Sequence, residues 1–153
     1  MVSVPLTEDE AQRIIDAEKG IKGDVIWKYD QNHEGFAKAE LIVDNDLGLD
    51  LRLHVTVNLT IPSRFSCNLT VSKAFGIRRL CMNKPHRNKH TDSNYLPGTH
   101  THFWTNACRD RWAAERDQPN PEDLPEALRL FLADCGITFA GKIRGVPGLQ
   151  QGF

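Results

Sequence analysis

The stretch LDLRLHVTVNLT, residues 49–60, decides the fold. Every odd-numbered position in it is apolar and every even-numbered position is polar. A period of two residues is typical of a β-strand with one buried face and one polar face. We therefore expect residues 49–59 to form a strand that turns Leu53 to the core and His54 to the polar face.

Stretches on either side of this strand have similar patterns. We expect further strands over residues 25–29, 36–44, 65–71 and 77–82, separated by turns. Strands joined by short turns run antiparallel. The sequence therefore predicts an antiparallel meander sheet of about five strands with a single apolar face.

Two segments have the features of helices that cover this apolar face. Thr7 and Glu10 form a capping box at the start of the first helix, and Gly20 is expected to end it. The second helix is predicted over residues 122–135, where apolar residues follow helical spacing and Gly136 provides a stop. A meander sheet covered by an N-terminal and a C-terminal helix makes the expected fold class α+β.

A chain of 153 residues falls in the size range of one domain. We expect a single α+β domain over residues 1–140 and a flexible C-terminal tail over residues 141–153. No apolar run approaches the roughly 20 residues that cross a bilayer, and the first residues lack the pattern of a signal peptide. The expected location is the cytoplasm, without membrane contact.

The four cysteines are scattered singly, with no C-x-x-C pair. Their neighbours suit buried strand or helix positions, and the cytoplasm keeps thiols reduced. We interpret all four as reduced thiols of the core rather than as a disulfide pair or a zinc cluster: Cys67, Cys81, Cys108 and Cys135.

Positive charge is concentrated in the middle of the chain. Residues 73–116 carry nine Lys and Arg against three Asp and Glu, although the whole chain has a net charge of −1. Four of the six histidines also lie in this segment. Such a segment is typical of a site for a polyanion such as RNA, but a surface that pairs with the chain's own acidic flanks has the same composition.

The histidines of the basic segment include a pair on one expected strand. His100 and His102 lie in THTHFW, residues 99–104, whose β-branched and aromatic residues favour a strand. On a strand these two histidines and Trp104 share one face, with about 6 to 7 Å between successive side chains. Two imidazoles so arranged can bind a metal, act as an acid and base pair, or be plain surface residues on a solvated face.

A metal site is one interpretation of the histidines. The spacings His86-x-x-x-His90 and His100-x-His102 both occur among zinc ligands. Neighbouring cations would repel a divalent ion: Lys84, Arg87 and Lys89. We therefore expect no bound metal and no cofactor, with zinc as the alternative.

Metal-independent cleavage of RNA is the interpretation that we favour. The reaction needs a base for the 2′-hydroxyl proton, an acid for the departing 5′-oxygen and a cation for the phosphorane. We predict His100 and His102 as the acid and base pair, with His86 or His90 as a third candidate. The predicted substrate-binding side chains are cations, an amide and an aromatic ring that can stack on a base: Arg79, Lys84, Arg87, Asn88, Lys89 and Trp104.

Four short motifs resemble those of a bacterial domain-of-unknown-function family: IRRL at 77–80, PHRN at 85–88, PGTHTHFW at 97–104 and DRWA at 110–113. Members of that family pair a P-G-x-H-x-H-aromatic strand with a D-[KR]-W-A ending, and the resemblance covers roughly residues 36–135. More loosely, a meander that ends in a loop rich in asparagine and histidine, followed by a helix, is similar to the TumE-type toxins of bacterial toxin–antitoxin pairs.

The looser resemblance implies a toxin whose partner is an antitoxin protein. Together with the basic segment it leads to our first hypothesis, a toxin-like, metal-independent endoribonuclease that acts on RNA. The alternative is a non-enzymatic module that binds nucleic acid or an acidic protein, such as a partner in a phage or defence system. Both hypotheses place the functional residues between Lys73 and Arg116.

Overall fold

The computed structural model describes residues 6–32, 34–61, 63–88, 95–96, 98–115 and 124–143. Within these ranges the chain forms two helices and eleven strands. In chain order they are α1 (Glu8–Asp16), β1 (Lys19–Ile21), β2 (Lys28–Tyr29), β3 (Phe36–Asn45), β4 (Leu51–Asn58), β5 (Phe65–Val71), β6 (Phe75–Met82), β7 (His86–Arg87), β8 (Tyr95–Leu96), β9 (His100–Thr105), β10 (Arg109–Glu115), α2 (Leu124–Asp134) and β11 (Ile137–Phe139). Neither helix in these ranges is long and apolar enough to cross a bilayer.

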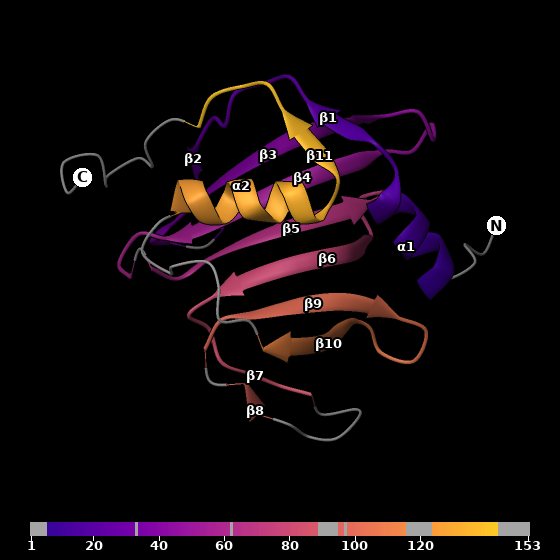
Figure 1. Cartoon of the computed structure of the whole chain (residues 1–153). Coiled ribbons are helices and arrows are strands. Elements are labelled where there is room, and N and C mark those ends of the chain that lie inside the picture. Colours follow the sequence, from indigo (N-terminus) through magenta and orange to yellow (C-terminus); the bar gives the residue numbers. More distant parts are fainter. Residues whose placement is uncertain are drawn as a thin grey trace.

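One sheet holds nine of these strands in the order β10-β9-β6-β5-β4-β3-β1-β11, with β2 paired to β3 (Figure 1). β7 and β8 form a separate two-stranded sheet. The pairings within the large sheet are antiparallel except for that of β1 with β11. The α+β class is confirmed, whereas the prediction of about five strands is wrong because the sheet is larger.

The strands that the prediction omitted are short or irregular. β1 and β11 have three residues each, which is too short to display a two-residue period. β10 contains a shift of register between Arg109 and Trp112, so its alternation is broken. The sheet therefore extends beyond both ends of the predicted meander.

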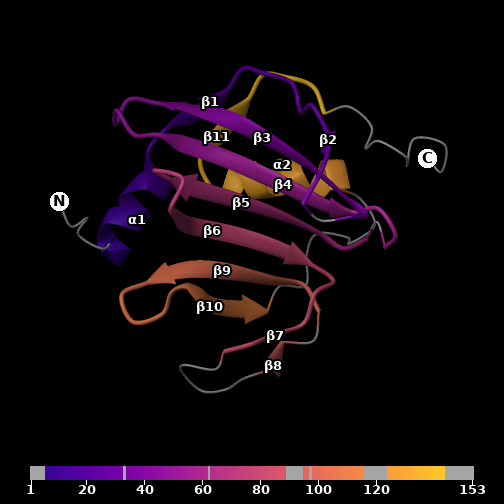
Figure 2. The same ribbon diagram turned by 180° about the vertical axis from the view of Figure 1, so that it is seen from behind.

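The centre of the sheet is the meander that the alternation predicted. β4 pairs with β3 and β5 so that Leu53 lies opposite Leu41 and Leu69, while His54 lies opposite Asn68. Leu53 is buried, with 1% of its surface exposed. α2 lies across this apolar face (Figures 1 and 2), and its buried side chains join those of the sheet in one core.

α1 begins as predicted and ends differently. Thr7 and Glu10 form the capping box at its N-terminus. At the other end, the Nζ atom of buried Lys19 donates hydrogen bonds to three carbonyls at the end of the helix. Gly20 lies in β1, so its predicted role as the helix stop is wrong: Lys19 satisfies the last carbonyls instead.

The chain after α2 returns to the sheet. Gly136 follows α2 with a φ of 69°, as expected of the residue that ends a helix. β11 then pairs in parallel with β1, and Ile143 bridges Val25. The first three residues of the predicted tail, 141–143, thus lie beside the sheet. The rest of that tail, 144–153, lies outside the described residues. The domain boundary at residue 140 stays a prediction.

All four cysteines are free and buried, as their interpretation as buried thiols requires. Cys67 and Cys135 belong to the hydrophobic core. Burial raises the pKa of the Cys67 thiol, so this group stays protonated at neutral pH. Cys81 has different surroundings, which are part of the candidate site.

The alternation in β4 can be tested with two neighbouring substitutions. Leu53→Asp places a charge in the core and should lower the free energy of unfolding by on the order of 3 kcal/mol or more. His54→Ala removes a partly exposed side chain that bonds Thr70 at 3.1 Å, and it should lower that free energy by about 1 kcal/mol at most. Urea unfolding measures both changes. Equal losses would show that the two faces of β4 are wrongly assigned.

Candidate functional site

The register between β6 and β9 brings the predicted histidines together with residues of β6. Cys81 lies opposite His100, and Arg79 lies opposite His102. Directly paired residues of antiparallel strands point to the same side of the sheet. Leu80 points the other way, into the core that α2 covers. The four polar side chains therefore share the face of the sheet opposite α2.

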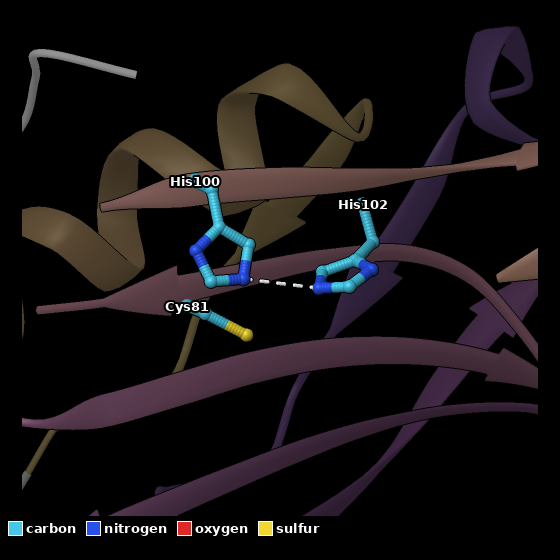
Figure 3. Close-up of side chains that lie close together, drawn as sticks. All are labelled: Cys81, His100 and His102. Carbon is cyan, nitrogen blue, oxygen red and sulfur yellow. Dashed lines mark hydrogen bonds between the residues drawn. The ribbon is translucent and has the colours of Figure 1, made fainter. Parts of the chain in front are cut away.

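Cys81, His100 and His102 form a compact group. The Nε2 atoms of the two histidines lie 3.1 Å apart, and Cys81 turns its sulfur toward the gap between the rings (Figure 3). One nitrogen of each ring and the sulfur all lie within 4.8 Å of one another. The exposed fractions are 2% for His100, 3% for His102 and 6% for Cys81. The interpretation of these histidines as plain surface residues is therefore wrong.

Each of the two histidines also donates a ring N–H to a backbone carbonyl. His100 Nδ1 lies 3.1 Å from the carbonyl oxygen of Gly98, and His102 Nδ1 lies 2.8 Å from that of Asp110. These two bonds and the contact between the two Nε2 atoms each need a hydrogen atom, three in all. Two neutral imidazoles have one N–H each and provide only two. With both N–H groups on the carbonyls, the lone pairs of the two Nε2 atoms face each other.

Arg79 lies beside His102 but does not satisfy its lone pair. The Nη2 atom of Arg79 is 3.2 Å from Nε2 and 3.3 Å from Nδ1 of that ring. An atom on the lone-pair axis of Nε2 would lie much farther from Nδ1 than from Nε2. The nearly equal distances therefore place the guanidinium off that axis.

Burial and positive charge disfavour protonation of the two rings. Burial, followed by the charges of Arg79 and the neighbouring histidines, lowers the pKa of His102 to about 3. Burial also lowers the pKa of His100, against the raising effect of nearby carbonyls. Burial raises the pKa of the Cys81 thiol, while the charges of Arg79 and Lys84 lower it. At neutral pH both imidazoles are therefore neutral.

β7 brings a third histidine onto the cluster. His86 stacks on His100 with ring centroids 5.2 Å apart, and it meets His102 edge-on at 4.6 Å. Its Nε2 atom donates to the carbonyl of Arg111 in β10 at 2.8 Å. The structure thus gathers three of the four histidines predicted for the site, and His90 lies outside the described residues.

Asn88 takes the place of a neighbouring strand at the edge of β10. Among the described strands, β10 is the outermost on its side of the sheet. The Asn88 side chain accepts a hydrogen bond from the N–H of Ala113 at 2.9 Å and donates one to its carbonyl at 2.8 Å. Asn88 is 5% exposed, so its amide serves this edge of β10 rather than an exposed substrate surface.

Trp104 belongs to the core and not to the histidine cluster. It is 6% exposed, it packs edge-on against Phe75, and its Nε1 donates to the carbonyl of Leu6. An indole buried in this way is not free to stack on an RNA base. The predicted role of Trp104 is therefore wrong, because the residue joins the packing of the N-terminal segment against the sheet.

The other predicted cations lie around the cluster. Arg87 is exposed, and its guanidinium carbon lies 5.2 Å from the ring centre of Tyr95. Lys84 is partly exposed. Lys89 lies outside the described residues. Arg79 contacts the ring of His102 through its guanidinium, whereas Lys84 reaches His100 through its backbone carbonyl.

A family model described as a family of unknown function, DUF6978, matches residues 6–137. The matched range contains both helices and every residue of the cluster. The chain belongs to the DUF6978 family. This match confirms the resemblance to an uncharacterised family, while nothing found supports the link to TumE-type toxins. No curated protein and no solved structure matches the chain.

Cys81 lies in the site of this DUF6978 protein, but it was not among the site residues predicted from the sequence. Alternation over residues 77–82 places Arg79 and Cys81 on one face, which was the available signal. The pairing of that strand with the histidine strand was not evident, because residues 83–99 separate the two. The carbonyls of Gly98 and Asp110 have no side-chain signal at all.

Removing the Asn88 amide should free the edge of β10. Asn88→Ala leaves the N–H and carbonyl of Ala113 without this partner and should lower the free energy of unfolding by about 1 to 3 kcal/mol. The Ala113 amide should then exchange faster with deuterium, as followed by NMR. The Arg111 amide is the internal control, because it bonds the Cys108 carbonyl and should keep its protection. Unchanged exchange at Ala113 would contradict the role given to Asn88.

Proposed function

We propose that Cys81, His100 and His102 bind a divalent transition metal ion, most simply zinc. The observation that carries this proposal is the shortage of one hydrogen atom among the three close contacts of the two rings. A cation between the two Nε2 atoms removes the repulsion between their lone pairs. Either a third proton or a metal ion can be that cation.

The charges around the cluster favour a metal ion over a proton. The pKa of His102 is lowered to about 3, so a third proton is not held at neutral pH. Arg79 opposes a metal ion as well, but metal binding deprotonates the Cys81 thiol and so adds a negative charge to the site. A proton shared by the two rings would not deprotonate Cys81 and so would add no negative charge to the site.

The donor set and its surroundings fit zinc. Zinc prefers thiolate and imidazole ligands, and a Zn–N distance of about 2.0–2.1 Å puts two nitrogens of a tetrahedral site about 3.3 Å apart. The separation of 3.1 Å between the two Nε2 atoms is close to that value. Zinc-bound histidines commonly donate their other N–H to a carbonyl, as His100 and His102 do.

A metal held by these residues would have two consequences. It would join β6, which carries Cys81, to β9, which carries His100 and His102, and would stabilise the folded chain because the unfolded chain lacks the site. Three protein ligands would also leave a fourth position for water or another ligand. An open position is typical of catalytic rather than structural zinc.

Metal content tests the proposal. Protein loaded with zinc and dialysed should hold one ion per chain by inductively coupled plasma mass spectrometry. Cys81→Ser and His102→Ala should each weaken zinc binding by more than about 100-fold, because each removes a ligand rather than a supporting group. Cys108→Ser and His54→Ala are matched controls that should keep the metal. Equal zinc content in all four variants would refute the assignment.

Endoribonuclease activity is a second candidate, favoured by one observation. His86, His100, His102 and Arg79 lie in one cluster, and metal-independent cleavage of RNA requires groups of these kinds. Because His100 and His102 are 2% and 3% exposed, RNA would reach them only if the covering β7 segment moved. The toxin class, the antitoxin partner, the polyanion partner and the binding-module alternative stay predictions.

An RNA cleavage assay separates the two candidates. If His100 and His102 act as acid and base, cleavage should persist in excess EDTA and leave 2′,3′-cyclic phosphate ends. His100→Ala should then lower the rate by roughly 10²- to 10⁴-fold, whereas His54→Ala should not. Loss of cleavage in EDTA and its recovery with zinc would assign the histidines to the metal instead.

A further inference from the structure

The charges of the proposed metal site do not balance. One thiolate and two neutral imidazoles leave a divalent ion with one positive charge, and Arg79 places a second one beside it. In the described ranges, no carboxylate oxygen is hydrogen-bonded to Arg79, His100 or His102. The Asp110 carboxylate lies beside Gly76 and the Asn68 amide and is not hydrogen-bonded to Arg79, so two positive charges in a site that is almost wholly buried still require a counter-charge.

Arg79 has a hydrogen-bond donor that such a counter-charge can use. Its Nε atom is buried and has no hydrogen-bond partner among the described residues. A buried N–H without a partner is uncommon, because it has given up its hydrogen bonds to water. The same guanidinium lies against the ring of His102 and close to the Cys81 thiol, so this donor is at the metal site.

Asn68 offers a second polar group, next to Arg79 and Gly76. It lies directly opposite Arg79 on β5, and its Oδ1 atom is also buried without a partner in the described part of the chain. A half-turn of the amide group presents Nδ2–H in place of Oδ1. The Arg79 and Asn68 side chains can then donate to one oxygen-bearing group.

We propose that Arg79 and the metal together bind an oxyanion, the oxygen of a carboxylate or a phosphate, at the fourth position of the site. This inference rests on the metal site proposed above. A guanidinium forms strong charge-assisted hydrogen bonds with carboxylate and phosphate oxygens. A bound oxyanion offsets the excess positive charge and satisfies the Nε donor of Arg79.

Anion binding and metal binding should therefore strengthen each other. Without an anion, Arg79 repels the metal, and with an anion this repulsion is offset. An anion that raises the affinity for the metal by a given factor gains the same factor in its own affinity. The ligands of this centre are thus molecules that carry a carboxylate or phosphate group.

Titration of Co²⁺ into the metal-free full chain tests the coupling, with the affinity read from the visible absorption of bound Co²⁺. In acetate, compared with perchlorate at equal ionic strength, the unsubstituted protein should bind Co²⁺ at least about fivefold more tightly. Methyl phosphate in place of acetate shows whether phosphate oxygens are bound as well. A protein-free blank corrects for Co²⁺ that the anions complex.

Substitutions at two adjacent arginines locate the effect. Arg79→Gln should bind Co²⁺ more tightly than the unsubstituted protein in perchlorate, because the repulsion is gone, and should lose the acetate effect. Arg79→Lys keeps the charge without the planar guanidinium, so it should bind Co²⁺ as before in perchlorate and lose most of the acetate effect. Arg78→Gln is the matched control: Arg78 lies on the opposite face, 4.5 Å from the ring centre of Phe103, and its variant should keep the acetate effect.

The outcomes separate the two proposals. Co²⁺ binding without any effect of acetate or methyl phosphate overturns the oxyanion subsite and leaves the metal site intact. An anion effect that survives in both Arg79 variants overturns the subsite as well. Absence of Co²⁺ binding in every buffer overturns the metal site itself and the subsite with it. A response to only one of the two anions supports the subsite and decides between carboxylate and phosphate ligands.

Discussion

β6 and β9 pair in a register on which every contact of the histidine cluster depends. Cys81 faces His100 and Arg79 faces His102 across the two strands. Because side chains alternate between the faces of a sheet, a slip of one residue would turn both histidines into the apolar core. Leu80 opposes such a slip, because it is fully buried in the core that α2 covers. Packing on one face of the sheet thus determines which polar residues meet on the other.

The cluster is buried, yet backbone groups hold most of its polar atoms in place. Carbonyls of Gly98 and Asp110 fix the orientation of both rings, since a ring that donates Nδ1–H must direct its Nε2 lone pair to the opposite side. Two neutral rings cannot supply a hydrogen atom to all three of their close contacts, and this shortage is what the described residues leave unresolved. Side chains that are held in position before binding lose little conformational entropy on binding, which supports the proposal of a metal site here.

One segment covers both the cluster and the edge of the sheet. His86 stacks on His100 and bonds the carbonyl of Arg111, while Asn88 bonds both backbone groups of Ala113. An uncovered strand edge is open to pairing with another chain, and these side chains occupy that edge of β10. Access to the histidines and access to the edge are therefore linked, because both require the same segment to move.

The sequence by itself determined the α+β class, the central meander, the start of α1 and the strand that carries His100 and His102, because alternation and capping are local patterns. It also indicated Arg79 as part of the site. The number of strands, the burial of the histidines and the inclusion of Cys81 were decided only by the tertiary structure. Residues 83–99 separate the strand of Cys81 from the strand of His100 in the chain. Pairing between strands so far apart leaves no periodic pattern in the sequence. The orientation of the two rings depends on backbone carbonyls, which every residue has and no side-chain pattern can reveal.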